Sequence, residues 1–268
     1  MGKGKLSKFA DMATFPNVFQ FHPLSPSREN GNDRMVCQPG DLAATLKKSS
    51  LWTRWEDLET APLILELGCG RGEYTVGLAR RFADKRFMGV DIKGARMWHG
   101  AQKALADGLT NAAFLRTNIE FIDRFFLPGE VSEIWLTFSD PQMKKPSKRL
   151  TSTNFLQRYR HIMPDGGLIH LKTDSQFLFT YTRELLRANS ITPEVCIEDI
   201  HSSANATPLL REVRTYYEEM WIERGIAIKY LCFHLPAKGS LIEPDIELPI
   251  DEYRSYNRHK RSSKETAR

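Results

Sequence analysis

The sequence predicts an α/β fold with a doubly wound, mostly parallel sheet of about seven strands and an antiparallel edge strand. Short apolar runs alternate with segments of helical periodicity, which is typical of a parallel sheet covered by helices on both faces. The first apolar run ends in three closely spaced glycines, as expected where a buried strand turns into a helix. A last β-rich run, 226–235, is the candidate for the antiparallel edge.

In the first half of the domain, apolar runs predict strands over 63–67, 87–92 and 113–116. Helices are expected between them, over 74–82 and 94–106, because apolar residues recur there every three or four positions. These residues are Val76, Ala79 and Phe82 in the first helix, and Met97, Ala101, Ala104 and Leu105 in the second.

The second half repeats the alternation, with strands predicted over 133–138 and 168–173. Ser152 or Thr153 can cap a helix that carries apolar residues at helical spacing. A further helix is expected directly after the strand 168–173, and another over 209–224.

The predicted domain covers residues 61–240. Residues 1–60, which are rich in Pro, Ser, Asn and Lys and lack sustained periodicity, form an N-terminal extension. Residues 241–268 form a polar, basic C-terminal tail. Both ends are expected to be partly flexible.

The composition indicates one soluble domain, since 41% of the 268 residues are hydrophobic and 26% are charged. No run approaches the roughly 18 apolar residues of a membrane span. The four cysteines form no CxxC pair and have no histidine at metal-ligand spacing, which indicates reduced thiols in the cytoplasm and no metal site. The net charge of +5 is weak evidence for a polyanionic partner, and the sequence leaves monomer and homodimer open.

The strongest local motif is the run 65–72, LELGCGRG, directly after the first strand. Its glycines let the backbone approach a ligand at the following helix N-terminus. The spacing is GxGxG rather than the GxGxxG of nicotinamide dinucleotide sites, and the Glu66 carboxylate would repel a pyrophosphate. A ligand with an amino group and a sulfonium favours that acid, so the loop predicts an S-adenosylmethionine site that includes Glu66, Gly68 and Gly70. A plain turn is the alternative, and Cys69 is expected to be a packed residue rather than a reactive thiol.

Polar residues end the next two strands. Asp91 lies about twenty residues past the loop, where an acid can accept hydrogen bonds from both ribose hydroxyls. Asn118, just past the third strand, can hold the adenine edge through its amide. Either residue can equally be a solvated turn residue.

The fourth strand ends at an acid that is followed by a basic cluster. Asp140 stands at the carboxyl end of the strand, where doubly wound sheets have their ligand crevice. Four cations follow within six residues: Lys144, Lys145, Lys148 and Arg149. A charge run is usually a solvated face, but beside the crevice these side chains can hold phosphates and orient a nucleic-acid strand.

With these motifs, the sequence resembles the tRNA (guanine-N7-)-methyltransferase family from about Leu63 to Leu235. The similarity rests on the segments LELGCGRGEY, GVDIKG, FSDP with its basic residues and RLTS, HLKTD, and TYYE. The FSDP and RLTS combination is specific, whereas the glycine loop alone is not. The resemblance implies a Rossmann-like class I S-adenosylmethionine-dependent methyltransferase fold, and a variable-loop guanosine of tRNA as the substrate.

The resemblance also implies roles for single residues. The implied cofactor contacts are Glu66, Asp91, Asn118 and Asp140, with Asp140 also the catalytic acid. The implied RNA contacts are Lys144, Asp174 and the segment 215–218, including Thr215 and Glu218. From the residues alone, Asp174 can instead cap the next helix, and Thr215 with Glu218 has capping-box spacing. Two positions depart from the family: Gln142 and Met143 follow the Asp-Pro pair where a ring is usual, and Asn118 replaces a frequent Asp.

Guanine N7 has no proton to lose, so its attack on a sulfonium methyl needs an in-line approach but no general base. Asp140 is predicted to stabilise the positive charge that develops on the purine, or to steer the cofactor's amino acid moiety. N7 lies in the deep groove of an RNA helix, so the target should be a base that can be exposed. Lys3, Lys5 and Lys8 form either a basic arm on the RNA or an inert tail.

Three alternatives stand beside this interpretation. Methylation of an exocyclic amine on a base, in another RNA or on a protein is disfavoured, because Gln142 stands where such enzymes often have a second proline and no ring follows. A small-molecule methyltransferase leaves the basic cluster without a purpose. An RNA-binding module with a decayed cofactor site is disfavoured by the intact Glu66, glycines and Asp91.

Overall fold

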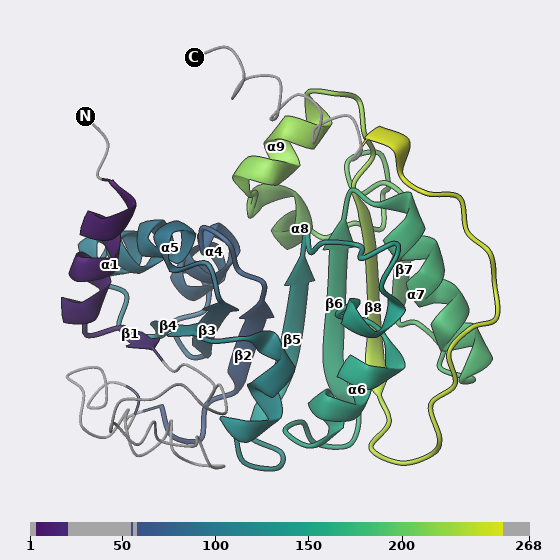
Figure 1. The fold of residues 1–268 in the computed structure, drawn as a ribbon, viewed down its shortest axis with the longest axis horizontal. Helices are drawn as coiled ribbons and strands as arrows, with labels where there is room; N and C mark the ends of the chain where they lie inside the picture. The colour runs from purple at the N-terminus through teal and green to yellow at the C-terminus, as the bar shows by residue number, and fades with distance from the viewer. Residues whose placement is uncertain (1–3, 21–54, 56–57, 254–268) are drawn as a thin grey trace, which may run out of the picture.

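The computed structural model describes residues 4–20, 55 and 58–253. Within them the chain forms one sheet with the strand order β1-β4-β3-β2-β5-β6-β8-β7 (Figure 1). The strands are β1 (Val18–Gln20), β2 (Leu63–Leu67), β3 (Arg86–Asp91), β4 (Ala112–Arg116), β5 (Val131–Thr137), β6 (Gly167–Thr173), β7 (Val195–Ile197) and β8 (Lys229–Leu235). Neighbours from β1 to β6 pair in parallel, and β8 pairs antiparallel with both β6 and β7. The predicted doubly wound, mostly parallel fold is confirmed.

The described sheet has eight strands where we expected seven, and β7 rather than β8 lies at its edge. The two strands without a sequence signal, β1 and β7, have three residues each. Alternation cannot be detected in so short a run, and both strands form only because a neighbouring strand offers its backbone groups. β1 pairs with β4 through Val18 and Phe114, so part of the segment 1–60 belongs to the sheet.

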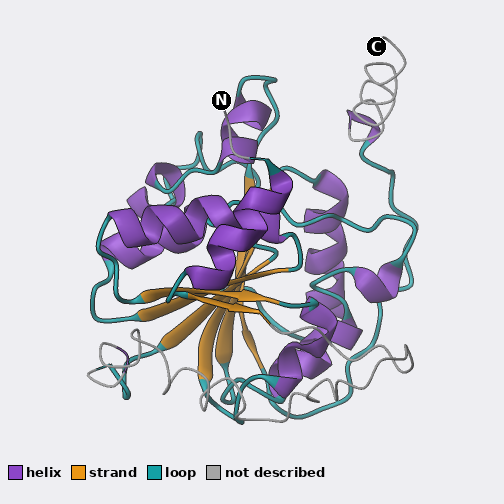
Figure 2. Ribbon diagram, turned by 60° about the vertical axis from the view of Figure 1, so that its left-hand side comes forward, coloured by secondary structure: helices purple, strands orange, loops and turns teal. Residues whose placement is uncertain are grey.

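Helices cover both faces of the sheet (Figure 2). The helices are α1 (Lys5–Thr14), α4 (Glu73–Arg81), α5 (Gly94–Ala106), α6 (Thr153–Arg160), α7 (Gln176–Ala188), α8 (Pro208–Glu212) and α9 (Tyr216–Ile222), with the 3-10 helices η1 (Ile119–Arg124) and η2 (Pro146–Lys148). None of the helices in the described part of the chain has the length and hydropathy to span a membrane.

The central strand β2 shows how the sheet separates two cores. Leu63, Leu65 and Leu67 pack into the core shared with α6 and α7, whereas Ile64 packs into the core shared with α4 and α5. This is the two-residue period of a strand, and each fully buried leucine contributes about 1.5–3 kcal/mol. Glu66 has the same parity as Ile64, so its side chain lies on the α4–α5 side.

The expected helix over 209–224 is wrong, because α8 and α9 are separate helices. The Thr215 hydroxyl accepts a hydrogen bond from the Glu218 amide at 3.1 Å, which starts a new helix. The buried Lys172 ammonium donates to the carbonyls of Leu210 and Val213, and so holds the end of α8 in place.

Both ends of the described chain pack on the domain. In α1, Asp11 accepts a hydrogen bond from the indole of Trp98 on α5. After β8 the chain runs past α7, on the right of Figure 1, and the Glu243 carboxylate accepts hydrogen bonds from Thr153 and Tyr181. The described residues do not include Lys3, the side chain of Lys5, residues 21–54 or residues 254–268. The expectation that both ends are partly flexible falls mostly on these residues and is not tested.

Candidate functional site

The order of the strands places the candidate site. β3 lies on one side of β2 and β5 on the other, so the winding reverses at β2. In doubly wound sheets, ligands bind outside the carboxyl ends of the strands at such a point. The loops that follow β2, β3, β4, β5 and β6 all lie at this edge, the upper one in Figure 1.

The glycine loop between β2 and α4 is tied to the end of β3. The amides of Gly68 and Cys69 donate to the Val90 carbonyl at 2.8 and 3.1 Å. The Gly70 amide donates to the Asp91 carboxylate at 2.9 Å. Gly68 and Gly70 have φ angles of 80° and 55°, in the left-handed region that favours glycine. The loop therefore lies folded over the ends of two adjacent strands.

Glu66, at the end of β2, is buried beneath this loop. Its side chain is buried, with one oxygen accepting from the amide and hydroxyl of Thr75 and the other from the hydroxyl of Thr137. Burial raises the pKa of Glu66 to about 7, although the hydrogen bonds from both threonines oppose the shift. Glu66 thus fastens the first turn of α4 to β5.

Asp91 and Asn118 follow adjacent strands. The two Asp91 oxygens accept one backbone hydrogen bond each, from Gly70 and from Lys93 at 2.8 Å, which leaves lone pairs for further donors. Asn118 is half-buried at the start of η1. The structure therefore brings both predicted polar side chains to the carboxyl edge.

The loop after β5 holds Asp140 in a constrained backbone. Phe138 and Gln142 have φ angles of 51° and 45°, which cost a non-glycine residue about 1–3 kcal/mol each. Asp140 is exposed, and its carboxylate accepts a hydrogen bond from the Gln142 amide at 2.9 Å. Met143 is held from two sides: its carbonyl accepts from Arg149 and its sulfur from the Asp251 amide.

The basic cluster divides into exposed lysines and one buried arginine. Lys144, Lys145 and Lys148 are exposed, and Lys148 pairs with the Glu120 carboxylate at 2.9 Å. Arg149 is only 6% exposed, and its guanidinium lies 4.8 Å and 4.3 Å from the ring centroids of Phe177 and Tyr181. Arg149, which was predicted as a phosphate ligand, is therefore buried against two rings, unlike the three lysines of the cluster.

The predicted RNA contacts Asp174, Thr215 and Glu218 are all buried. Asp174 accepts a hydrogen bond from the Tyr253 hydroxyl at 2.8 Å, and the cap of α7 is Ser175 instead. Glu218 is completely buried and pairs with Lys172 at 2.8 Å. Thr215 and Glu218 thus anchor the start of α9, and Asp174 links the end of β6 to Tyr253.

Among the buried hydroxyls without a hydrogen-bond partner in the described residues, two follow strands at this edge. They belong to Thr117, directly after β4, and Ser139, two residues after β5. An unsatisfied buried polar group costs about 1–3 kcal/mol, so such groups at a ligand-binding edge indicate a polar ligand. The same described residues contain no cluster of three or more His, Cys, Asp or Glu side chains that could hold a metal ion.

Known proteins are similar to the chain along its full length. A family model described as "Putative methyltransferase" matches residues 60–231. A tRNA (guanine-N(7)-)-methyltransferase of Bacteroides fragilis (strain YCH46) is 54% identical over 268 residues and covers 100% of both chains. A relative of the same name in Geobacillus kaustophilus (strain HTA426) is 34% identical over 67% of this chain and 82% of its own. The chain belongs to the tRNA (guanine-N(7)-)-methyltransferase family.

A solved structure shares the fold of this methyltransferase. The 16S rRNA methyltransferase KamB superposes with a TM-score of 0.52 at 15% identity, over 68% of this chain and 92% of that chain. At that identity the likeness concerns the fold alone.

A buried lysine next to the candidate site of this methyltransferase is absent from the sequence-based predictions. Lys172 lies in β6 with no exposed surface, and its ammonium contacts Glu218 and two carbonyls of the α8–α9 segment. The sequence did contain a signal for this ion pair: Lys172 lies within a strand that was expected to be buried. A buried ammonium needs a carboxylate partner from another element. Burial lowers the pKa of Lys172, and the neighbouring Glu218 opposes that shift.

Proposed function

We propose that this methyltransferase transfers the methyl group of S-adenosylmethionine to N7 of a variable-loop guanosine in tRNA, in the cytoplasm. The relatives that span the whole chain carry the name tRNA (guanine-N(7)-)-methyltransferase. The observation that carries the proposal is the position of Asp140: an exposed carboxylate that follows β5 at the switch-point edge. β5 pairs with β2, which ends in the glycine loop, and three exposed lysines follow Asp140 in the chain.

The residues present fit the cofactor. Asp91 would accept hydrogen bonds from the ribose hydroxyls, and Asn118 would hold the adenine edge. Gly68 and Gly70 leave the loop without side chains where the cofactor would lie. The unpartnered hydroxyls of Thr117 and Ser139 are available to its polar groups. Glu66 would act through the loop it supports, since both its oxygens are already hydrogen-bonded. When bound, S-adenosylmethionine supplies a methyl group activated by a sulfonium.

Asp140 would stabilise the charge on the purine rather than remove a proton from it. The N7 lone pair lies in the ring plane and carries no proton, so positioning is what the protein must contribute. The purine becomes positively charged when N7 is methylated, and a carboxylate beside it stabilises that charge. The hydrogen bond from the Gln142 amide and the constrained backbone on either side fix the Asp140 carboxylate before the RNA arrives.

The RNA would be held at the rim of this edge. Lys144, Lys145 and Lys148 are exposed and can contact phosphates. Asp174, Thr215 and Glu218 are buried, so we assign them to positioning the surface on which the RNA lies. N7 is poorly accessible in a regular RNA helix, which fits a target base in a loop.

The decisive test incubates purified protein with tRNA and methyl-labelled cofactor, and identifies the product nucleoside by mass spectrometry. We expect 7-methylguanosine, and we expect Asp140→Asn to lower kcat by roughly 100-fold or more with little change in cofactor affinity. Asp165→Asn is the matched control, because Asp165 is also an exposed carboxylate that accepts a backbone amide, at the opposite edge of the sheet.

Each other outcome has a definite meaning. If the labelled methyl group were found on an exocyclic amine, the assignment to N7 would be wrong. If titration with S-adenosylmethionine released no heat in a calorimeter, the cofactor site would be decayed. Wild-type turnover in Asp140→Asn would remove Asp140 from its proposed role.

A further inference from the structure

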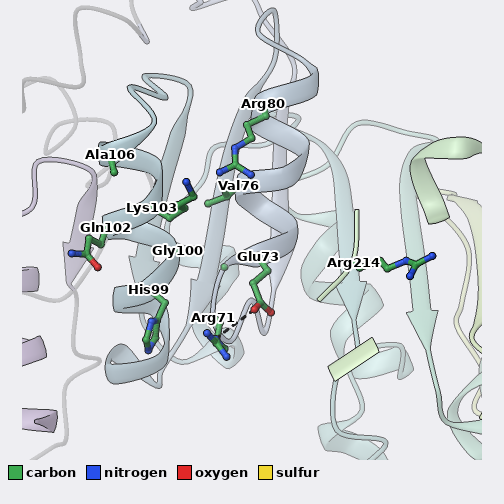
Figure 3. Close-up of a pocket in the computed structure, with 11 residues that line it drawn as sticks. Arg71, Glu73, Val76, Arg80, His99, Gly100, Gln102, Lys103, Ala106 and Arg214 are labelled. Atoms are coloured by element: carbon green, nitrogen blue, oxygen red, sulfur yellow. Dashed lines mark ion pairs between the residues drawn. The ribbon is translucent and has the colours of Figure 1, made fainter. Parts of the chain in front are cut away.

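A groove of about 530 Å³ lies between α4 and α5, on the face away from α6 and α7 (Figure 3). Its floor exists because two glycines meet there. A Cβ atom on Gly100 would lie 2.7 Å from the Arg71 carbonyl and 2.8 Å from the Gly72 Cα. The glycine loop and α5 can therefore approach closely, and the longer side chains further along α4 and α5 form the walls.

The walls of the groove are strongly basic. Arg71, Arg80, Lys103 and Arg214 line it, against the single carboxylate of Glu73. His99 also lines the groove. Its pKa is lowered by burial and by the positive charges of Lys8 and Arg71. The Lys8 ammonium of α1 lies 2.9 Å from the His99 ring and so adds a cation at the rim. Separate parts of the chain thus bring positive charge to one place.

Two exposed cations in the C-terminal halves of α4 and α5 are tethered to one carboxylate. Arg80 and Lys103 both bind the Asp107 carboxylate, with an Arg80 Nε–Oδ2 distance of 2.8 Å and a Lys103 Nζ–Oδ1 distance of 2.6 Å. Two cations share one carboxylate, so the trio keeps a net positive charge. Side chains that are already ordered lose less conformational entropy when they bind an anion.

The other end of the groove reaches the RNA-facing segment of the proposed site. The Arg71 guanidinium lies 5.3 Å from the ring centroid of Tyr216, which is 53% exposed. The Tyr216 amide donates to the Glu73 carboxylate at 2.9 Å, which joins α9 to α4. Arg214 directly precedes the TYYE segment. Exposed aromatic rings beside a basic groove are typical of surfaces that bind single-stranded nucleic acid.

The chemistry of the lining selects the class of ligand. Small-molecule pockets are lined mainly by apolar side chains, whereas this lining is mostly charged or polar, with Val76 and Ala106 as its apolar side chains. Protein interfaces are depleted of charge at their centre, whereas charged side chains line this groove along its length. Ordered cations in an elongated groove complement a polyanion.

We propose that the α4–α5 groove binds the sugar–phosphate backbone of the tRNA substrate, away from the base that is methylated. The inference rests on the proposed function, because it takes tRNA as the ligand. The cations lining the groove contact phosphates and therefore contribute affinity and orientation without reading the sequence.

The test compares two double variants with the same local chemistry. Arg80→Gln/Lys103→Gln removes the groove pair that shares Asp107. The control Arg183→Gln/Arg187→Gln removes two arginines that share Glu184 on α7, on the other side of the sheet. Binding of tRNA is measured by fluorescence anisotropy between about 50 and 200 mM salt.

For the groove variant we expect the slope of log affinity against log salt to flatten by about one for each phosphate that the variant no longer binds. We also expect the KM for tRNA to rise roughly tenfold with kcat unchanged. The control should match the wild type. Arg214→Gln, at the other end of the groove, should flatten the slope by about one on its own. Calorimetric titration with S-adenosylmethionine shows whether each variant is folded.

A groove variant that keeps the wild-type slope and KM overturns the proposal, and so does a control that loses as much. If Arg80→Gln/Lys103→Gln fails to bind cofactor and is therefore misfolded, Arg214→Gln decides in the same way. The proposed function is judged separately, by 7-methylguanosine from the wild type. A wild type that binds tRNA through this groove but yields no 7-methylguanosine would refute the function and leave the groove standing.

Discussion

Replacing Lys172 by methionine tests the ion pair that ties β6 to the α8–α9 segment. Methionine keeps the length of the side chain but removes the ammonium that lies 2.8 Å from Glu218. Both side chains of the pair have no exposed surface, so Glu218 would be left as a buried charge. The His201 ring lies 3.4 Å from the other Glu218 oxygen.

The expected loss of unfolding free energy is about 3–5 kcal/mol, the usual cost of removing one partner of a buried pair. The carbonyls of Leu210 and Val213 lose a donor as well, which places the expected loss toward the upper end. Lys172→Met/Glu218→Leu should recover part of the loss, because replacing both charges by apolar groups removes the unpaired carboxylate.

Urea unfolding followed by circular dichroism measures these changes. Lys85→Met is the control, because Lys85 pairs with Glu133 at 3.1 Å but is partly exposed, and its loss should cost at most about 1 kcal/mol. The reasoning is refuted if Lys172→Met costs no more than this control. It is also refuted if the double variant is as unstable as the sum of the two single variants.

Three further outcomes are expected. Glu66 holds its proton more tightly in the folded protein, with a pKa of about 7 against 4.5, so its stabilisation is complete below pH 4.5 and is lost as the pH rises through 7. Relative to Glu66→Gln, the wild type should therefore lose about 3 kcal/mol between these pH values in urea unfolding, and parallel pH profiles would contradict this. Gly72→Ala should lower the Tm by several degrees, at roughly 2–4 °C per kcal/mol of lost stability. The added Cβ would lie 2.5 Å from the Phe114 ring, and the backbone there has a φ of 70°. An unchanged melting curve would mean that the loop adapts freely. Arg149→Gln should lower the unfolding free energy by about 1–2 kcal/mol and leave the salt dependence of tRNA binding unchanged; a flatter slope would restore Arg149 to the RNA site.

The central fold could be predicted because local patterns dictate it. The predicted bounds of β2, 63–67, and of α5, 94–106, are those observed, since a buried strand and an amphipathic helix each leave a period in the sequence. The glycine loop, Asp91 and Asp140 could be assigned to one site for a related reason. Each directly follows a parallel strand, and the ends of parallel strands meet at one edge.

Burial of individual polar residues could not be predicted. Arg149 belongs to a run of cations that resembles one exposed surface, yet it packs between Phe177 and Tyr181 on a different helix. Glu66 lies beneath its loop because Thr137, far along the chain, supplies a hydroxyl. These partners are distant in sequence, and a pattern of neighbouring residues carries no information about them.

Local sequence patterns were sufficient to predict the alternation of strands and helices from β2 to β6, the glycine loop and the acid after β5, because each depends on contacts within a few residues. Tertiary structure decided which polar groups are buried, where α8 ends and α9 begins, and that Arg71, Arg80, Lys103 and Arg214 line one groove. The physical reason is that desolvation and charge proximity depend on distance in space. The packing of α4 against α5 and the docking of the α8–α9 segment set those distances for the groove, and contacts with α7 and β5 set them for Arg149 and Glu66.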